Sequence, residues 1–195
     1  MPPDTICDES TPPGPQHEIA PKVGVALERA FTEAKLPEQR GVVLRISFVL
    51  GPNGGAMQRL TRITRLGLGG TVGSGRQWIS WIHQDDLNRL IVEAARQDVY
   101  TGVYMVTAPN PVTNRQFMRE MRRVYGRPWV PPAPAFAVRL ACRVILNNDP
   151  ELALLGRRCV PTRLMKEHNF TFRYDNVGDA IAAIRDAERA SRAER

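Results

Sequence analysis

Residues 41–52, GVVLRISFVLGP, constrain the fold more than any other stretch of the chain. β-Branched and aliphatic residues follow one another without the polar alternation of a half-exposed strand, and Gly51 and Pro52 close the run. Continuous apolar runs of this kind are typical of a strand covered on both faces, as in a parallel sheet. Because parallel strands need helical crossovers, the run predicts an α/β chain. Arg45 interrupts it, and a buried arginine requires a partner, so we expect a structural ion pair there.

Helical and strand patterns alternate around this run. Residues 1–21 are rich in proline and polar groups and predict a loop. Strands are predicted over 41–52, 101–109 and 170–174, and residues 127–134 are expected to be extended. Apolar residues at helical spacing predict helices over 22–35, from 56 to the glycines at 67–70, and over 85–97, 113–126, 134–146, about 150–156, 161–168 and 176–190. Thr113 is the expected N-cap of the helix over 113–126.

Composition narrows the functional classes. The 195 residues are 43% hydrophobic and carry a net charge of +7, values of a globular chain without the apolar run of about 18 residues that a membrane span needs. The arginines are scattered and form no aromatic-interleaved basic stripe, so nucleic acid is not the expected partner. The three cysteines are far apart in sequence and include no C-x-x-C pair, which predicts reduced thiols and no metal site. The expected compartment is the cytoplasm.

The glycine clusters do not form a dinucleotide-phosphate turn. GPNGG at 51–55 follows a strand but has the wrong spacing, and GLGGTVGSG at 67–75 follows a helix. Both are predicted to be turn or loop glycines.

The segment GSGRQWISWIHQDDL, residues 73–87, admits two interpretations. Asp85 or Asp86 stands where a helix begins, and a carboxylate there is expected to cap the helix. His83 either orients the loop through a backbone hydrogen bond or serves as a ligand-facing acid or base.

The two tryptophans and the arginine of this segment are also open to two readings. Trp78 and Trp81 belong either to the core or to the wall of a cleft. Arg76 is either a surface side chain or a contact for an anionic ligand, since its guanidinium offers a fork of donors. The segment is predicted to be a helix entry behind a cleft-facing loop.

Three long motifs follow in order: RLGLGG-x-x-GSG, WIH-x-x-DL and APNPVTN. Together with VPTRLMKEHNFTFRY they resemble the C-terminal portion of epimerase-family proteins. These proteins form an atypical extended subgroup of the short-chain dehydrogenase/reductase superfamily. The subgroup is grouped with nucleoside-diphosphate-sugar epimerases and has a C-terminal domain of unknown function. The resemblance runs from about residue 8 to residue 187. It implies a partial Rossmann-type parallel sheet that lacks its N-terminal strands, with a small, mainly helical C-terminal lobe.

The resemblance also implies domains, a cofactor and contacts. Residues 1–21 are expected to be a loop segment, 22–109 the end of the NADP(H)-binding domain and 110–195 the substrate lobe. The implied cofactor contacts are Ser47, Gly51 and Pro52. The implied substrate contacts are Arg76, Trp78, Trp81, His83 and Asn110, and His83 is the one candidate for catalysis.

Two departures from the family pattern argue against the ordinary catalytic mechanism and the ordinary nucleotide-sugar substrate of extended members. Extended members use a Tyr-x-x-x-Lys pair as general acid/base, and counting back from Glu28 places these positions at Ala20 and Gly24, which cannot move a proton. Ile79 and Phe48 stand where related epimerases carry an arginine and an asparagine for the nucleotide sugar.

Two functions remain open. The first is an NAD(P)-dependent epimerase or reductase acting on an unidentified small molecule, impaired or inactive as an isolated chain. The second is a non-catalytic interaction module. A sheet without its first strands leaves an open edge, which predicts a homodimer or pairing with an N-terminal partner chain.

Overall fold

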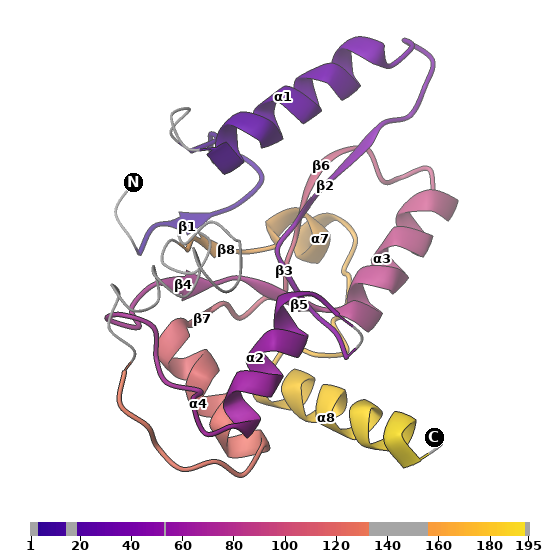
Figure 1. The fold of residues 1–195 in the computed structure, drawn as a ribbon. Coiled ribbons are helices and arrows are strands. Elements are labelled where there is room, and N and C mark those ends of the chain that lie inside the picture. Colours follow the sequence, from indigo (N-terminus) through magenta and orange to yellow (C-terminus); the bar gives the residue numbers. More distant parts are fainter. Residues whose placement is uncertain (1–3, 15–18, 53, 133–155, 194–195) are drawn as a thin grey trace.

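The computed structural model describes residues 4–14, 19–52, 54–132 and 156–193 (Figure 1). The predicted helices over 134–146 and about 150–156 lie outside the described residues. In chain order the elements are β1 (Ile6–Cys7), α1 (Ile19–Ala34), β2 (Val42–Ile46), β3 (Phe48–Leu50), α2 (Gly55–Arg65), β4 (Trp78–Ile79), β5 (Trp81–His83), α3 (Gln84–Arg96), β6 (Gly102–Val106), β7 (Val112–Thr113), α4 (Asn114–Val124), β8 (Arg158–Cys159), α7 (Thr162–Glu167) and α8 (Val177–Ala193).

The long apolar run forms two strands instead of one. β2 pairs in parallel with β6, and β3 pairs in parallel with β5, so the run changes partners at Ser47. The backbone N–H of Ser47 still donates to the carbonyl of Val106, at 3.1 Å, which ends the β2–β6 pairing. The parallel α/β arrangement predicted from this run is confirmed.

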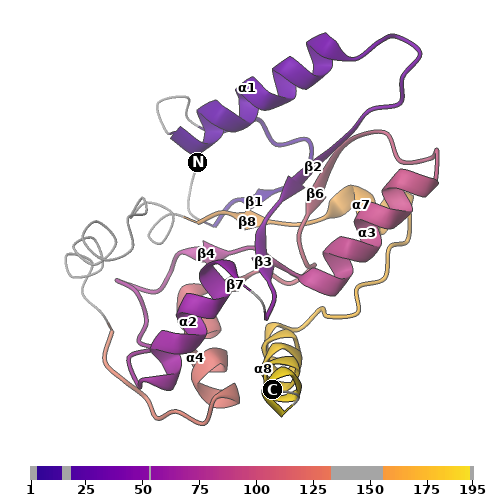
Figure 2. The same ribbon diagram turned by 45° about the vertical axis from the view of Figure 1, so that its right-hand side comes forward.

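The helices surround the strands unevenly. α3 and α7 lie beside β6, while α2, α4 and α8 gather at the far end of the molecule near β3 and β7 (Figures 1 and 2). α1 stands apart on the other side of β2 in both views. Most α1 residues are partly or fully exposed, including Leu27 at 66%.

Two apolar clusters form the core. The first unites Leu50 and Trp81 with Phe117 and Ile181, so residues on both sides of the predicted domain boundary at 109/110 share one core. The second lies between α3, β6 and α7 and contains Leu90, Tyr104, Leu164 and their neighbours. Each fully buried large side chain stabilises the fold by about 1.5–3 kcal/mol. Because the first cluster contains side chains from both predicted domains, its packing couples the two.

The N-terminal segment is more ordered than predicted. Ile6 and Cys7 form β1, which pairs in parallel with β8, and α1 begins at Ile19, three residues earlier than expected. A two-residue strand has no periodicity of its own, and its partner is far away in sequence.

The predicted strand over 170–174 is wrong. The backbone N–H groups of Arg173 and Tyr174 donate to the carboxylate of Asp86, at 2.9 and 3.0 Å, instead of to a neighbouring strand. A buried side chain replaces the strand partner that the apolar alternation suggested.

Thr113 caps α4 as predicted. Its hydroxyl accepts from the N–H of Gln116 at 3.3 Å, and the side chain of Gln116 accepts from the N–H of Thr113 at 2.8 Å. This reciprocal capping box satisfies two backbone donors at the start of the helix. Within the described ranges, no helix has the length and apolar character to cross a membrane.

Candidate functional site

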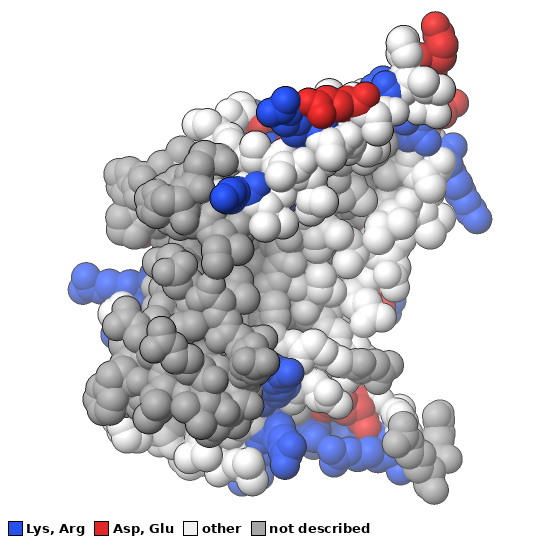
Figure 3. Space-filling view, turned by 45° about the horizontal axis from the view of Figure 1, so that its top comes forward, with Lys and Arg blue, Asp and Glu red and all other residues white. Residues whose placement is uncertain are grey.

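A cleft of about 710 Å³ separates α1 from the β2–β6 pair. One wall is α1 around Gly24 and Glu28, the floor is β2, and residues 11–14 with Cys7 and Cys159 close one end. Few charged side chains mark the hollow beneath α1 (Figure 3). The cleft therefore has mostly apolar walls, the usual character of a site for a ring or an aliphatic group.

One ion pair fastens α1 across this cleft. The guanidinium of Arg45 donates from Nε and Nη2 to the two carboxylate oxygens of Glu28, at 2.7 and 2.8 Å. The hydrogen bond from Arg45 holds the pKa of Glu28 below its usual value. The structural ion pair predicted for Arg45 is confirmed, and it sets the position of α1 over the sheet.

Gly24 lies on the wall of the cleft, four residues before Glu28. A Cβ atom at this position would meet nothing within 4 Å. The position that the resemblance assigns to a catalytic lysine therefore borders open space and carries no side chain.

The three cofactor candidates fall in different places. Ser47 lines the cleft, and its hydroxyl donates to the carbonyl of Val106 at 3.0 Å. Gly51 and Pro52 are not among the cleft residues. Gly51 packs against the side chain of Gln84, where a Cβ atom would collide.

The two tryptophans lie in different environments, and only the core role is confirmed, for Trp81. Trp81 is fully buried in the first core cluster, and its indole N–H donates to the carbonyl of Asn110 at 3.0 Å. Trp78 is partly exposed, donates to Asp4 at 2.9 Å and carries the guanidinium of Arg158 4.5 Å above its ring. Trp81 is thus part of the core, and Trp78 remains available at the surface.

His83, not an aspartate, caps α3. Its Nδ1 accepts from the N–H of Asp85 at 3.1 Å. The ring is 4% exposed and lies 4.0 Å from the ring of Tyr174. Burial lowers the pKa of His83, opposed by the charges of Asp85 and Asp86, so the ring is neutral at neutral pH and can accept this hydrogen bond.

The expectation that Asp85 or Asp86 caps α3 is therefore wrong. The helix begins one residue earlier, which places both carboxylates inside its first turn. Asp86 is 1% exposed and accepts from the backbone of Arg173 and Tyr174 and from the side chain of Arg89. It fastens the segment before α8 to α3, a role that the sequence could not reveal because the partners lie 87 and 88 residues away.

The remaining substrate candidates are exposed. Arg76 lies on the surface of the glycine-rich loop. Asn110 donates from its amide to the carbonyl of Asp175 at 3.0 Å. None of Arg76, Trp78, Trp81, His83 and Asn110 lines the cleft under α1, whereas Ser47 does. Their contact with a substrate stays a prediction.

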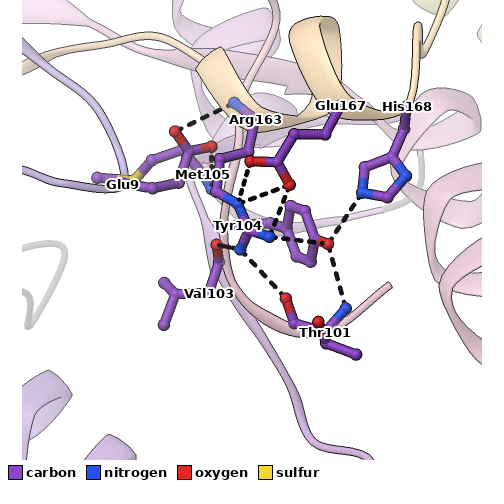
Figure 4. Close-up of polar contacts among 8 residues, drawn as sticks. All are labelled: Glu9, Thr101, Val103, Tyr104, Met105, Arg163, Glu167 and His168. Carbon is purple, nitrogen blue, oxygen red and sulfur yellow. Dashed lines mark hydrogen bonds and ion pairs between the residues drawn. The ribbon is translucent and has the colours of Figure 1, made fainter. Parts of the chain in front are cut away.

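A polar cluster on the outer side of β6 resembles a catalytic centre but has a different role (Figure 4). Arg163 donates to the carbonyls of Thr101 and Val103, at 3.1 and 2.7 Å. Glu9 accepts from the N–H of Met105 at 3.0 Å and from the N–H of Arg163 at 3.3 Å. These backbone groups of β6 point away from β2, so the cluster closes the outer edge of the strand.

Aromatic side chains complete the cluster. The hydroxyl of Tyr104 lies 2.9 Å from Nε2 of His168 and accepts from the N–H of Thr101 (Figure 4). His168 stacks on Tyr100 at 4.0 Å, and burial, followed by the charge of Glu93, raises the pKa of Tyr100 to about 12. A phenol with so high a pKa stays protonated, which fits a structural hydrogen bond and not proton transfer. Among the described residues no group of three or more potential metal ligands occurs.

Comparison with known proteins agrees with this architecture. Residues 133–184 match a domain of unknown function, DUF1731. The chain is 37% identical over 180 residues to the chloroplastic epimerase family protein SDR39U1 homolog of Arabidopsis thaliana, covering 92% of this chain and 49% of that protein. It is 32% identical to the epimerase family protein YfhF of Bacillus subtilis, covering 83% of this chain and 59% of that one.

Solved structures show the same relation. The human epimerase family protein SDR39U1 (isoform 2), solved with NADPH, superposes with a TM-score of 0.83 at 30% identity, covering 93% of this chain and 60% of that one. A nucleoside-diphosphate sugar epimerase from Corynebacterium glutamicum gives a TM-score of 0.71 at 28% identity, covering 92% and 33%. The chain thus has a partial Rossmann-type fold and spans about half the length of the curated relatives it matches.

Proposed function

Because the chain belongs to the epimerase family of atypical short-chain dehydrogenases/reductases, we propose that it supplies the substrate-side portion of an NADP(H)-dependent enzyme acting on a small molecule. The rest of the nucleotide-binding domain is supplied by a segment equivalent to the part of the relatives that this chain does not match, in the same or a second polypeptide. The open outer edge of β2 is the observation that carries this proposal.

The alternating direction of the backbone hydrogen-bonding groups along β2 identifies this edge. The N–H of Gly102 donates to the carbonyl of Gly41, and the N–H of Ser47 donates to the carbonyl of Val106. Backbone direction alternates along a strand, so Val42, Leu44 and Ile46 point their N–H and C=O groups away from β6. Among the described residues these outward groups have no hydrogen-bond partner. Such an edge is a template for one more parallel strand.

α1 supports the same reading. Its apolar side chains Val23, Leu27 and Phe31 recur every four residues and are 51%, 66% and 43% exposed. Ile46, on the neighbouring edge strand, is 50% exposed. Exposed apolar side chains grouped in this way are typical of a region that another polypeptide segment covers. A strand added to β2 would bring a second layer of side chains beneath α1.

The cofactor does not fit this chain alone. A dinucleotide needs a glycine-rich turn that leads from a strand into a helix and holds the pyrophosphate. The described walls of the cleft offer Ser47, Arg157, the Glu28–Arg45 pair and mostly apolar side chains, but no turn of that kind. Binding of NADP(H) therefore requires the segment of the relatives that carries this turn.

The chemistry of such a complex would differ from that of ordinary extended reductases. Gly24 borders the cleft without a side chain, and Ala20 stands one turn before it, so neither position can exchange a proton. If a proton is transferred, the group that moves it comes from the substrate, the second polypeptide or a residue elsewhere. We assign this chain the roles of enclosing the substrate and excluding water.

A fluorescence titration with NADPH tests the proposal. The folded chain is titrated alone and after mixing with the unmatched half of the Arabidopsis relative, produced separately. We expect saturable binding only in the mixture, and that half alone is the control. Equal binding by that half with and without this chain would overturn the proposal.

A second candidate function is a non-catalytic interaction module, favoured by the same exposed face of α1. In that case the chain associates with itself or another protein, and the mixture does not bind NADPH. Light scattering separates the two: a dimer formed through β2 in the absence of any partner favours the module.

A further inference from the structure

Two of the three cysteines face each other across a pair of strands. Cys7 in β1 is the direct register partner of Cys159 in β8. Neighbouring strands lie about 4.8 Å apart, within the roughly 4.4–6.8 Å between Cα atoms that a disulfide spans. The two cysteines are far apart in sequence, but the fold makes them neighbours, and both are free thiols in the structure, as the sequence predicts.

The two thiols differ in access. Both line the end of the cleft under α1. Cys7 is 4% exposed, whereas Cys159 is partly exposed. Burial raises the pKa of the Cys159 thiol, and a hydrogen bond with the Cys7 thiol contributes in the same direction. Cys159 is therefore the more accessible of the two thiols.

We propose that Cys7 and Cys159 form a dithiol that a low-molecular-weight disulfide oxidises to an intramolecular disulfide. The Cys159 thiolate attacks one sulfur of the small disulfide, forming a mixed disulfide and releasing one small thiol. The Cys7 thiolate then attacks Sγ of Cys159 and displaces the second small thiol. Two protein thiols are oxidised, one small disulfide is reduced, and the two protons pass to the released thiols.

The disulfide would fasten one wall of the cleft. β1 is held to β8 by a short parallel pairing that the N–H of Val160 extends by donating to the carbonyl of Cys7 at 2.9 Å. Residues 11–14 follow β1 and line the cleft. Glu9, which closes the outer edge of β6, lies on the same segment. Oxidation would therefore fix both the cleft wall and this clamp, whatever the enzyme's substrate.

The experiment uses oxidised glutathione as the probe and intact mass under non-reducing conditions as the readout. The full chain and its Cys142→Ser variant, which keeps only the proposed pair, are incubated with the probe, and remaining thiols are alkylated. We expect both proteins to lose two hydrogens, with a peptide that links Cys7 to Cys159, and their thermal unfolding midpoint to rise.

Single variants test the order of attack. In Cys7→Ser, a glutathione adduct is expected to accumulate on Cys159, because no second thiol displaces it. In Cys159→Ser, we expect Cys7 to react only after denaturant is added. The rate in the full chain should increase with pH, since the attacking species is a thiolate. Circular dichroism checks the fold, and alanine replaces serine where a serine variant does not fold.

Three results would overturn the proposal. One is a disulfide that joins Cys142 to either partner in the native chain. Another is a glutathione adduct that persists in Cys142→Ser. The last is a Cys142→Ser protein that keeps two free thiols at every pH at which it stays folded. None of these results bears on binding of NADPH, so this test stands apart from that of the proposed function.

Discussion

The two outer edges of the β2–β6 pair differ in whether their outward backbone groups have hydrogen-bond partners. The edge of β6 is closed by Arg163 and Glu9, which supply donors and an acceptor to its outward backbone groups. The outward groups of β2 have no partner within the described part of the chain. An edge that is the natural end of a sheet carries its own protection, and one that lacks it is a place for another strand.

The largest effect should come from opening the closed edge. Arg163→Met removes the guanidinium that donates to the carbonyls of Thr101 and Val103, so both carbonyls lose this hydrogen bond. We therefore expect the free energy of unfolding to fall by about 3 kcal/mol. Urea unfolding measures it. Arg119→Met, whose side chain is 68% exposed and among the described residues pairs only with Glu120 next to it, should cost less than about 0.5 kcal/mol. Equal losses would mean that Arg163 does not protect this edge.

The next effect concerns the open edge and appears only in association. Ile46→Lys places a charge at a side chain that is 50% exposed, so the isolated chain should keep its stability within about 0.5 kcal/mol. Affinity for the unmatched half of the Arabidopsis relative should fall by about 2 kcal/mol, or roughly thirtyfold in Kd. Calorimetry measures the stability and the affinity of the unchanged chain and of the Ile46→Lys variant. Ile91→Lys on α3, 43% exposed, is the control and should bind normally. Unchanged binding by Ile46→Lys would exclude β2 as the contact.

A smaller effect is expected for Glu9→Gln. The amide oxygen can still accept from Met105 or from Arg163, but not from both, so about 1 kcal/mol should be lost. Hydrogen exchange at Met105 reports the change directly. Glu33→Gln on α1, which pairs only with Arg29 on the surface, should leave that amide protected as before.

The smallest effect is a pH dependence confined to α1. Arg45 lowers the pKa of Glu28 in the folded chain, so the ion pair contributes fully above the unfolded value near 4.5 and is lost as pH falls through the lower folded value. Amide protection in α1 should decline in that acidic window, while protection in β6 persists. Arg45→Met should abolish the step. A step that survives in the variant would point to another carboxylate.

What the sequence predicted correctly was local. The apolar run at 41–52 required parallel partners, and Thr113 with Gln116 carries its capping box within four residues. The motifs that resemble the epimerase family are also contiguous.

What the sequence missed depends on contacts between distant segments. The pairing of Cys7 with Cys159 and the two backbone donors to Asp86 come together only when the chain is folded. The capping error had a local cause, since aspartate is the commoner cap and β5 carries its pairing up to His83.

The junction at Ser47 has one more consequence. The N–H and the hydroxyl of Ser47 both donate to the carbonyl oxygen of Val106. This oxygen marks the point where the β2–β6 pairing stops and the β3–β5 pairing begins. Because side chains alternate between the faces of a sheet, one inserted residue anywhere between 42 and 50 would reverse every side chain beyond it. Leu50 would leave the core cluster it shares with Trp81 and Phe117. The length of this run is therefore as strictly fixed as its hydrophobicity.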